Sequence, residues 1–361
     1  MKAKNVMQTI LLIIGILIIV YTLYSSSTLN NGTINIVNKN RVQNFSEYNN
    51  NLSIVKEIGT IEVYFCPQDN CTEILYNFIT AANNSLYCAL YDLDLVQVIK
   101  VINNKSYYIK TKLVVDNNNK IDFNNKYQNY KKPSQFIKYD NNNQLMHNKF
   151  CIRDNNTVLT GSFNPTYNGA YNNNNNIIII NSKTVAKNYN DEFFELWHGV
   201  FGKGDRVNNP IIILNNYTVE NYFCPEDNCQ EKLLTNIKSA NKSIYFMTFS
   251  FTDNAIGANL VLKLKKNISV KGIFESRQIS KYSEYELLKY QGADIILDKN
   301  PKSMHHKVFI IDNRTVITGS YNPTKNGNTR NDENIIIIND PFIVNKFINE
   351  FISLYNKYSK P

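Results

Sequence analysis

The sequence MHNKFCIRDNNTVLTGSFNPT at residues 146–166 returns as MHHKVFIIDNRTVITGSYNPT at residues 304–324. From Met146 to Gly169, 16 of 24 positions are identical to the residue 158 places later (305 − 147 = 158). A period of this length is too long for a stacked repeat, so each copy is predicted to be a domain-sized unit. The same offset relates two further pairs of segments: YFCPQDNC at 64–71 with YFCPEDNC at 222–229, and the isoleucines at 177–180 with those at 335–338.

The length of 361 residues and the 43% hydrophobic content suit two domains, each large enough to bury its own core. The repeat and the composition of the N-terminal part together predict five segments along the chain: a membrane segment at 1–24, an asparagine-rich stalk at 25–58, a first domain at 59–201, a linker at 202–216 and a second domain at 217–361.

Each domain alternates strand-like and helix-like segments, which predicts an α/β sandwich with helices over a mixed sheet. In the second domain the pattern is clearest in two strand-like and two helical segments: Ser243–Phe251, Ser269–Phe274, Ala255–Lys266 and Pro341–Tyr355.

A hairpin is predicted from the strand-like segments 308–311 and 316–318, with His305 and Lys307 pointing outward from the edge of the sheet. The asparagine runs at 141–143 and 172–176 are expected to be surface loop, because asparagine is abundant throughout the chain.

The N-terminus carries an uncharged stretch from Val6 to Tyr24, preceded by Lys2 and Lys4. The stretch is long enough to cross a bilayer, and the lysines favour an N-terminus in the cytoplasm. The alternative is a cleaved signal peptide. Both interpretations place the two domains outside the cytoplasm, either on a single membrane anchor or secreted.

The net charge of +9 favours an anionic partner, either nucleic acid or anionic lipid headgroups, and does not choose between them.

Four of the six cysteines recur at the same spacing in both halves: Cys66, Cys71, Cys224 and Cys229. In an oxidising compartment this pattern predicts two local disulfides. The alternative is one zinc site built from all four. Cys88 and Cys151 align with phenylalanines in the second half and are predicted to be apolar core residues.

Strand alternation places His147 and Lys149 on one face, and likewise His305 and Lys307. Histidine can act as a nucleophile or as a general acid near neutral pH. Lysine and asparagine can hold the non-bridging oxygens of a phosphoryl group. Two such sets related by a pseudo-two-fold axis place one histidine on each side of a phosphorus atom, which suits in-line displacement through a phosphohistidine.

The pattern His-x-Lys-x4-Asp followed by Gly-Ser-x-Asn resembles that of the phospholipase D superfamily. The second half looks most like its bacterial endonuclease and mitochondrial cardiolipin hydrolase branches. Members of those branches carry one motif and work as homodimers. The resemblance therefore implies a monomer in which the duplicate supplies the second half-site.

The resemblance implies a role for each matching residue. His147 attacks phosphorus and His305 protonates the leaving oxygen, and no metal or cofactor is needed. Glu333 supports a catalytic histidine, whereas the aligned residue of the first half is the neutral Asn175 (333 − 158 = 175). The remaining residues bind phosphate or organise the site: Lys149, Lys307, Asn164 and Asn322 with Ser162 and Ser320, and Asp154 and Asp312.

Other polar residues are assigned structural roles. His306 is expected on the opposite strand face from Lys307, and His198 at an aromatic helix end. Asp92 and Asp94 are interpreted as a strand end and a helix cap.

The leading hypothesis is a membrane-anchored phosphodiesterase that hydrolyses phospholipids. A surface endonuclease of the same mechanism and an inactive binding module are the alternatives.

Overall fold

The computed structural model describes residues 54–127 and 136–360. The predicted membrane segment at 1–24 lies outside these residues, as does most of the predicted stalk. Within the described ranges no helix is long and apolar enough to cross a bilayer.

The first half builds a seven-stranded sheet in the order β2-β8-β7-β6-β3-β4-β5. Strands β3, β4 and β5 pair in parallel and the others antiparallel, so the sheet is mixed as predicted. Its elements are β2 (Thr60–Cys66), α2 (Cys71–Thr80), β3 (Ser85–Leu90), α3 (Val96–Lys105), β4 (Lys110–Val115), the 3-10 turn η1 (Asn117–Asn119), α4 (Lys120–Tyr127), β5 (Ile137–Tyr139), β6 (Lys149–Arg153), β7 (Thr157–Gly161), α5 (Tyr167–Tyr171), β8 (Asn175–Asn181) and α6 (Lys183–Trp197).

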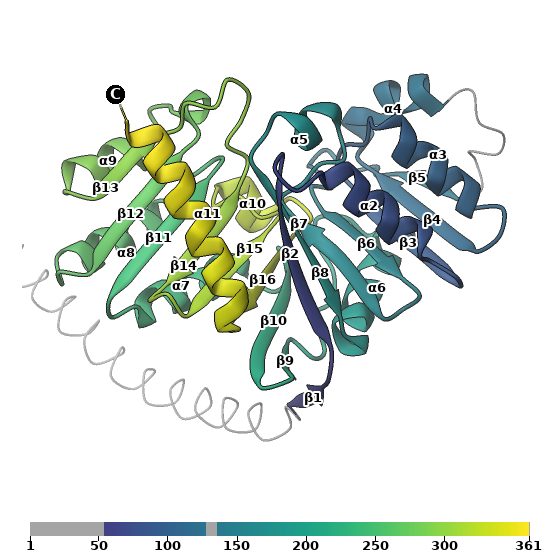
Figure 1. Ribbon diagram of the computed structural model, residues 1–361, viewed down its shortest axis with the longest axis horizontal. Helices are drawn as coiled ribbons and strands as arrows, with labels where there is room; N and C mark the ends of the chain where they lie inside the picture. The colour runs from purple at the N-terminus through teal and green to yellow at the C-terminus, as the bar shows by residue number, and fades with distance from the viewer. Residues whose placement is uncertain (1–53, 128–135, 361) are drawn as a thin grey trace, which may run out of the picture. The chain divides into compact units, whose positions relative to one another are not determined.

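The second half repeats this order in β10-β16-β15-β14-β11-β12-β13 and extends it with β9 and β1 to nine strands (Figure 1). Its elements are β9 (Ile211–Leu214), β10 (Tyr217–Cys224), α7 (Cys229–Ser239), β11 (Ser243–Thr248), α8 (Asn254–Leu264), β12 (Ser269–Phe274), η3 (Ser276–Gln278), α9 (Tyr285–Tyr290), β13 (Asp294–Leu297), β14 (Lys307–Ile311), β15 (Thr315–Gly319), α10 (Lys325–Thr329), β16 (Glu333–Ile338) and α11 (Pro341–Ser359).

Two segments predicted to be connecting chain contribute strands. β1 (Val55–Glu57) comes from the predicted stalk and pairs in parallel with β9, which comes from the predicted linker. The first half therefore lends a strand to the sheet of the second half. The two strands are counterparts in the repeat, because the 158-residue offset places β1 at residues 213–215, which overlap β9.

The isoleucine runs are buried on both faces of their sheets. In β8, Ile178 and Ile180 belong to one core, and Ile177 belongs to another with the partly buried Ile179 packed against it. A strand covered on both sides needs no polar alternation. These runs therefore form central strands rather than edges.

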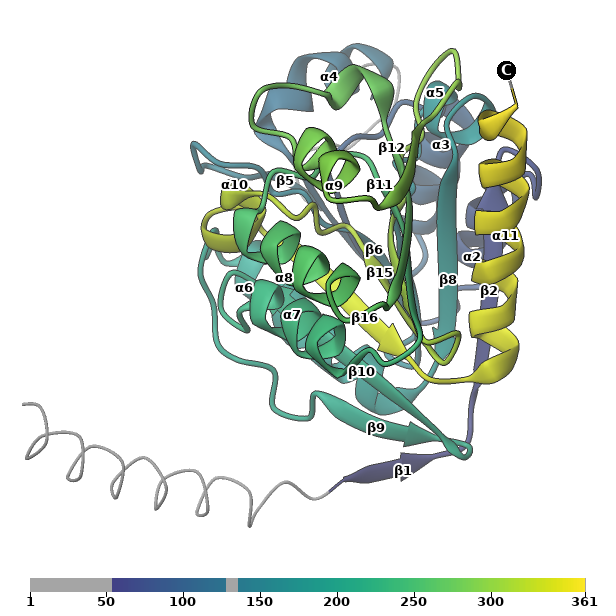
Figure 2. The same cartoon turned by 90° about the vertical axis from the view of Figure 1, so that its left-hand side faces the viewer.

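Helices α6 and α11 close the core that both halves share. Helix α6 packs on β3 and β7 of its own half and also on β10, while α11 packs on β15 of its own half and on β2 (Figures 1 and 2). The side chains of Phe193 on α6 and Phe347 on α11 lie in one cluster with residues of both sheets. Residues from Ile54 onward form a single compact unit as a result.

The predicted hairpin exists, since β14 and β15 pair antiparallel with Ile311 opposite Thr315. Its predicted place at the sheet edge is wrong. β14 lies between β11 and β15 in the middle of the sheet, and His305 precedes it where the two halves meet.

Three disulfides are present in the described residues, two of them local: Cys66 with Cys71 and Cys224 with Cys229. The interpretation of Cys88 and Cys151 as unpaired core residues is wrong. They are fully buried, but the register of β3 against β6 places them directly opposite each other, 4.1 Å apart at Cα, and they form the third disulfide.

Candidate active site

The two motif histidines lie where the halves meet, and each is anchored by the other half. The backbone N–H of His147 donates to the carbonyl of Asp332, and that of His305 donates to the carbonyl of Asn174, both at 2.9 Å. The two bonds are equivalent under the 158-residue offset. Reciprocal contacts of this kind are the signature of two-fold symmetry, so the halves are related by a pseudo-two-fold axis.

The side chains of the histidines are also held across the interface. Nδ1 of His147 lies 2.7 Å from Oε2 of Glu333 in the second half. Nδ1 of His305 lies 2.8 Å from Oδ1 of Asn175 and 3.1 Å from the carbonyl of Ser162, both in the first half. Because both neighbours of the His305 Nδ1 are acceptors, this nitrogen carries the hydrogen. The Nε2 atom is then left for a ligand.

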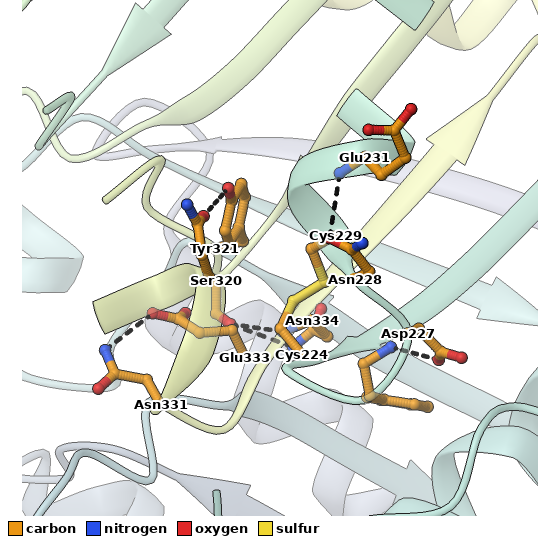
Figure 3. Close-up of a disulfide and its surroundings, with 12 residues drawn as sticks. Cys224, Asp227, Asn228, Cys229, Glu231, Ser320, Tyr321, Asn331, Glu333 and Asn334 are labelled. Carbon is orange, nitrogen blue, oxygen red and sulfur yellow. Dashed lines mark hydrogen bonds between the residues drawn. A yellow bond between two sulfur atoms is a disulfide. The ribbon is translucent and has the colours of Figure 1, made fainter. Parts of the chain in front are cut away.

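Glu333 sits at the start of β16, next to one of the local disulfides (Figure 3). It pairs in register with Cys224 of β10, and its Oε1 accepts from Asn331 at 3.4 Å. In the first half Asn175 pairs with Cys66 in the same way. Each local disulfide therefore closes the end of the strand beside a histidine-supporting residue.

A second layer of polar residues lies behind the histidines. Asn148 donates to Glu192 at 3.2 Å and accepts from Asn334 at 2.8 Å. The equivalent residues repeat the arrangement: His306 lies 3.4 Å from Glu350 and 3.1 Å from Asn176. All six are buried, which confirms a structural position for His306.

The expectation that residues 172–176 are surface loop is wrong, since Asn174, Asn175 and Asn176 are at most 3% exposed. They occupy the places of Asp332, Glu333 and Asn334 in the repeat. A run of asparagine has no apolar periodicity, so composition alone could not reveal a buried strand. The run at 141–143 is loop.

Both motif lysines are buried against the histidine backbones. Lys149 Nζ donates to the carbonyl of His147 at 2.7 Å, and Lys307 Nζ donates to that of His305 at 3.0 Å. Burial lowers the pKa of Lys149 to about 7, and it lowers the pKa of Lys307 well below its ordinary value, with further lowering from Lys149. A phosphate anion between the lysines would reverse this effect by favouring their charged forms.

Burial also governs the histidines and their support. It lowers the pKa of His147 and of His305 well below the ordinary value, and the two lysines add to the lowering. Burial raises the pKa of Glu333 to about 8. Without an anion the site therefore favours neutral imidazole, which is the form of histidine that can attack phosphorus.

Both histidines line one cavity of about 540 Å³. Its other lining residues are Tyr91, Leu145, Asn164, Phe249, Ser250, Thr252, Gln278, Asn322, Thr324, Lys325, Asn326 and Asn331. The side-chain oxygens of Asn164 and Asn322 are buried with no hydrogen-bond partner among the described residues. These two amides are thus available to a ligand.

Tyr91 and Phe249 are site residues that the sequence analysis missed. Their rings pack edge-on against His147 and His305 at centroid distances of 4.9 and 4.7 Å. The ammonium groups of the lysines lie 5.0 and 4.9 Å from the same rings. A signal was present, because both positions are aromatic at the 158-residue offset.

The motif aspartates lie away from the cavity. Asp154 accepts from the backbone N–H groups of Asn83, Asn84 and Ser85, and Asp312 accepts from the equivalent three groups. They fix the turn at the far end of the strand that begins with the lysine. This position fits an organising role.

Asp94 does not cap α3, whose N-cap residue Leu95 makes no side-chain cap bond. The carboxylate of Asp94 accepts from the backbone N–H of Tyr167 at the start of α5 and pairs with Lys126 at 3.2 Å. The helix-cap interpretation is therefore wrong. Asp253, which aligns with Leu95 in the repeat, caps α8 with its side chain.

The domain model described as cardiolipin synthase, phospholipase D-like domain, matches the chain twice, at residues 75–197 and 233–355. The two matches are again 158 residues apart and together cover more than half of the chain. The chain belongs to the phospholipase D superfamily. It carries two copies of the superfamily's domain and is a phosphodiesterase of that class.

Individual relatives agree with this assignment. A phospholipase D of Rickettsia bellii is 30% identical over 141 residues, which are 39% of this chain and 70% of the relative. A mitochondrial cardiolipin hydrolase of Chlamydomonas reinhardtii is 30% identical over 129 residues, 35% of this chain and 57% of the relative. The crystal structure of the phosphatidylserine synthase of Haemophilus influenzae has the same fold as both halves of this chain, with a TM-score of 0.64. The two proteins are 12% identical, and the match covers 87% of this chain and 91% of the synthase.

Proposed function

We propose that the protein hydrolyses phospholipids at the headgroup side and releases phosphatidic acid. One observation carries the proposal: both histidines face one cavity, and each Nδ1 is engaged by a polar side chain of the other half. The Nε2 atoms are then left to work on opposite sides of one phosphorus atom.

In the first step the Nε2 lone pair of His147 forms a bond to phosphorus. The bond from phosphorus to the leaving oxygen breaks, and His305 gives that oxygen a proton from Nε2, which it takes up when the substrate's phosphate anion raises its pKa. In the second step His305 takes a proton from water, the water oxygen bonds to phosphorus, and the bond from phosphorus to His147 breaks. Lys149, Lys307, Asn164 and Asn322 stabilise the phosphoryl oxygens in both steps.

The support of the two histidines favours this assignment of roles. A phosphohistidine carries positive charge on its ring, and that charge lowers the pKa of the adjacent Glu333. The resulting carboxylate stabilises the ring better than an amide does. His305 has the neutral Asn175 instead, so its imidazolium gives up a proton more readily. The nucleophile is therefore assigned to the histidine beside the carboxylate.

The choice of lipid is supported by the names of the relatives and by the predicted membrane segment at 1–24, which would hold both domains at an outer membrane face. Cleavage of nucleic acid by the same chemistry is the alternative. The test incubates the full chain with short-chain phospholipids and with single-stranded DNA in parallel, and traps labelled phosphate on His147 by acid-free quenching. DNA cleavage without any lipid product would replace the proposal with a nuclease. No cleavage of either substrate, with no label on either histidine, would leave a binding module.

A further inference from the structure

The catalytic cavity is not symmetric about the two histidines. Apart from the motif residues, the first half contributes only Tyr91 and Leu145 to its lining. The second half contributes Phe249 and seven polar residues, which form the second-half wall: Ser250, Thr252, Gln278, Thr324, Lys325, Asn326 and Asn331. Asn331 lies on the His147 side, because its side chain bonds to Leu145 and Glu333. Phe249 packs on the ring of His305, and Glu275, the N-cap of the turn that carries Gln278, accepts from the backbone N–H of Met304. This part of the wall therefore lies on the side of His305.

Residues at equivalent positions show that the two sides differ in charge. Ser250 and Thr252 stand where the first half has Asp92 and Asp94, because the offset of 158 residues relates them. Lys325 stands where the first half has Tyr167. The second half has thus replaced two carboxylates by hydroxyls and a tyrosine by a cation.

Lys325 is a cation in the cavity wall that forms no ion pair within the described residues. Among the described residues it has no ion-pair partner, and no carboxylate lines the cavity. The nearby Arg277 is different, because its Nε donates to the buried Glu275 at 2.8 Å. On the first-half side the available cation, Lys126, is paired with Asp94 at 3.2 Å.

We propose that the second-half wall of the cavity is an anion subsite, which binds a further phosphate carried by the leaving alcohol. Lys325 supplies the charge, and Gln278, Ser250 and Thr252 supply hydrogen-bond donors. The inference rests on the proposed function, since His305 protonates the leaving oxygen and the leaving group must lie on its side. A lipid headgroup that ends in phosphate and the next phosphate of a nucleic-acid strand share this chemistry.

The test compares substrates that differ only in that second phosphate. Water-soluble short-chain phosphatidylglycerol and phosphatidylglycerol phosphate form the lipid pair, and thymidine dinucleotide with and without a terminal phosphate forms the nucleic-acid pair. For the full chain we expect a KM about tenfold lower for the lipid that carries the second phosphate, the effect of one charge-assisted contact. Lys325→Gln should bring the KM ratio close to one, and Lys325→Arg should preserve it.

Tyr167→Gln is the matched control, because it alters the equivalent position of the first half and should leave the ratio unchanged. Discrimination within the dinucleotide pair alone supports the subsite and overturns the lipid assignment. Equal KM values in both pairs, with normal turnover of a chromogenic diester, overturn the subsite and leave the proposed function intact. No turnover of any diester overturns the proposed function itself.

Discussion

The carboxylate of Glu333 lies 2.7 Å from Nδ1 of His147, although the two residues belong to different halves of the chain. The equivalent contact joins His305 to Asn175, so each half completes the histidine site of the other. One of these contacts has a carboxylate and the other an amide. The duplication has therefore produced one shared site with two unlike ends.

His147→Asn and His305→Asn should each abolish nearly all turnover of a chromogenic phosphodiester, because attack and protonation need one histidine each. The loss of kcat should be at least about 10²–10⁴-fold, the worth of a general acid. Unchanged melting temperatures would show that the variants fold. More than a tenth of wild-type activity in either variant would contradict a shared site.

Glu333→Gln and Asn175→Asp change the supports in opposite directions. Loss of the carboxylate should lower kcat strongly, because the charged ring of His147 loses its counter-ion. A new carboxylate beside His305 should raise its pKa and move the pH optimum of kcat upward. The two pH profiles are the measurement, and small equal effects of both changes would show that these residues do not support the histidines.

The sequence predicted the histidines, the lysines and Glu333 because their spacing is repeated and needs no knowledge of the fold. It could not show that Glu333 supports the histidine of the other half, since that contact depends on how the two sheets face each other. The pairing of Cys88 with Cys151 was missed for the same reason. Only the register between β3 and β6 brings these residues together.

The sequence also did not predict that polar residues are buried where the two halves meet. Asn175 and Asn176 have the composition of a loop, yet they are fully buried because each makes hydrogen bonds across the interface. Their alignment with Glu333 and Asn334 indicates a strand at this position, whereas their composition predicts a surface loop. In a duplicated chain, position in the repeat is thus better evidence of burial than local polarity.

Turnover should be unaffected by excess EDTA, because lysines and histidines perform the charge stabilisation that a divalent ion supplies in other phosphodiesterases. All six cysteines are in disulfides, so a chelator has no cysteine-bound structural metal to remove. The measurement is kcat with and without EDTA. A loss that added Mg²⁺ or Zn²⁺ restores would contradict the proposed chemistry.

Binding of an oxyanion should take up protons. The pKa of Lys149 is lowered to about 7, so much of this lysine is neutral at pH 8, and an anion beside it raises the pKa and draws in a proton. Sulfate is a suitable probe because it does not titrate in this range. Calorimetry in two buffers of different ionisation enthalpy should show uptake of at least about one proton at pH 8. The uptake by Lys149 should be smaller at pH 6. Equal heats in both buffers would mean that the lysines are charged before the anion binds.

The stability contributed by three carboxyl groups at the interface should fall as the pH rises. Burial raises the pKa of Asp332 to about 8 and that of Glu226 to about 7, and it raises the pKa of Glu192 well above its ordinary value. These groups bind protons more tightly in the folded chain than in the unfolded chain. Their contribution is complete below the unfolded pKa near 4 and is lost as the pH rises through 7 to 8.

Asp332→Asn should lower by one the number of protons that the folded chain binds in excess of the unfolded chain. Oδ1 of Asp332 accepts from the backbone of Gly202, which an amide oxygen can also do, and Oδ2 has no partner within the described residues. The equivalent residue Asn174 shows that asparagine fits such a place. Between pH 5 and 8 the free energy of unfolding should fall less steeply with pH in the variant than in the wild type. The difference in slope should be up to about 1.4 kcal/mol per pH unit. At pH 8 it should therefore have the higher melting temperature. Asp191→Asn, on the exposed side of α6, is the matched control and should keep the wild-type slope. Parallel curves of unfolding free energy against pH for Asp332→Asn and the wild type would show that Asp332 is charged in the folded protein.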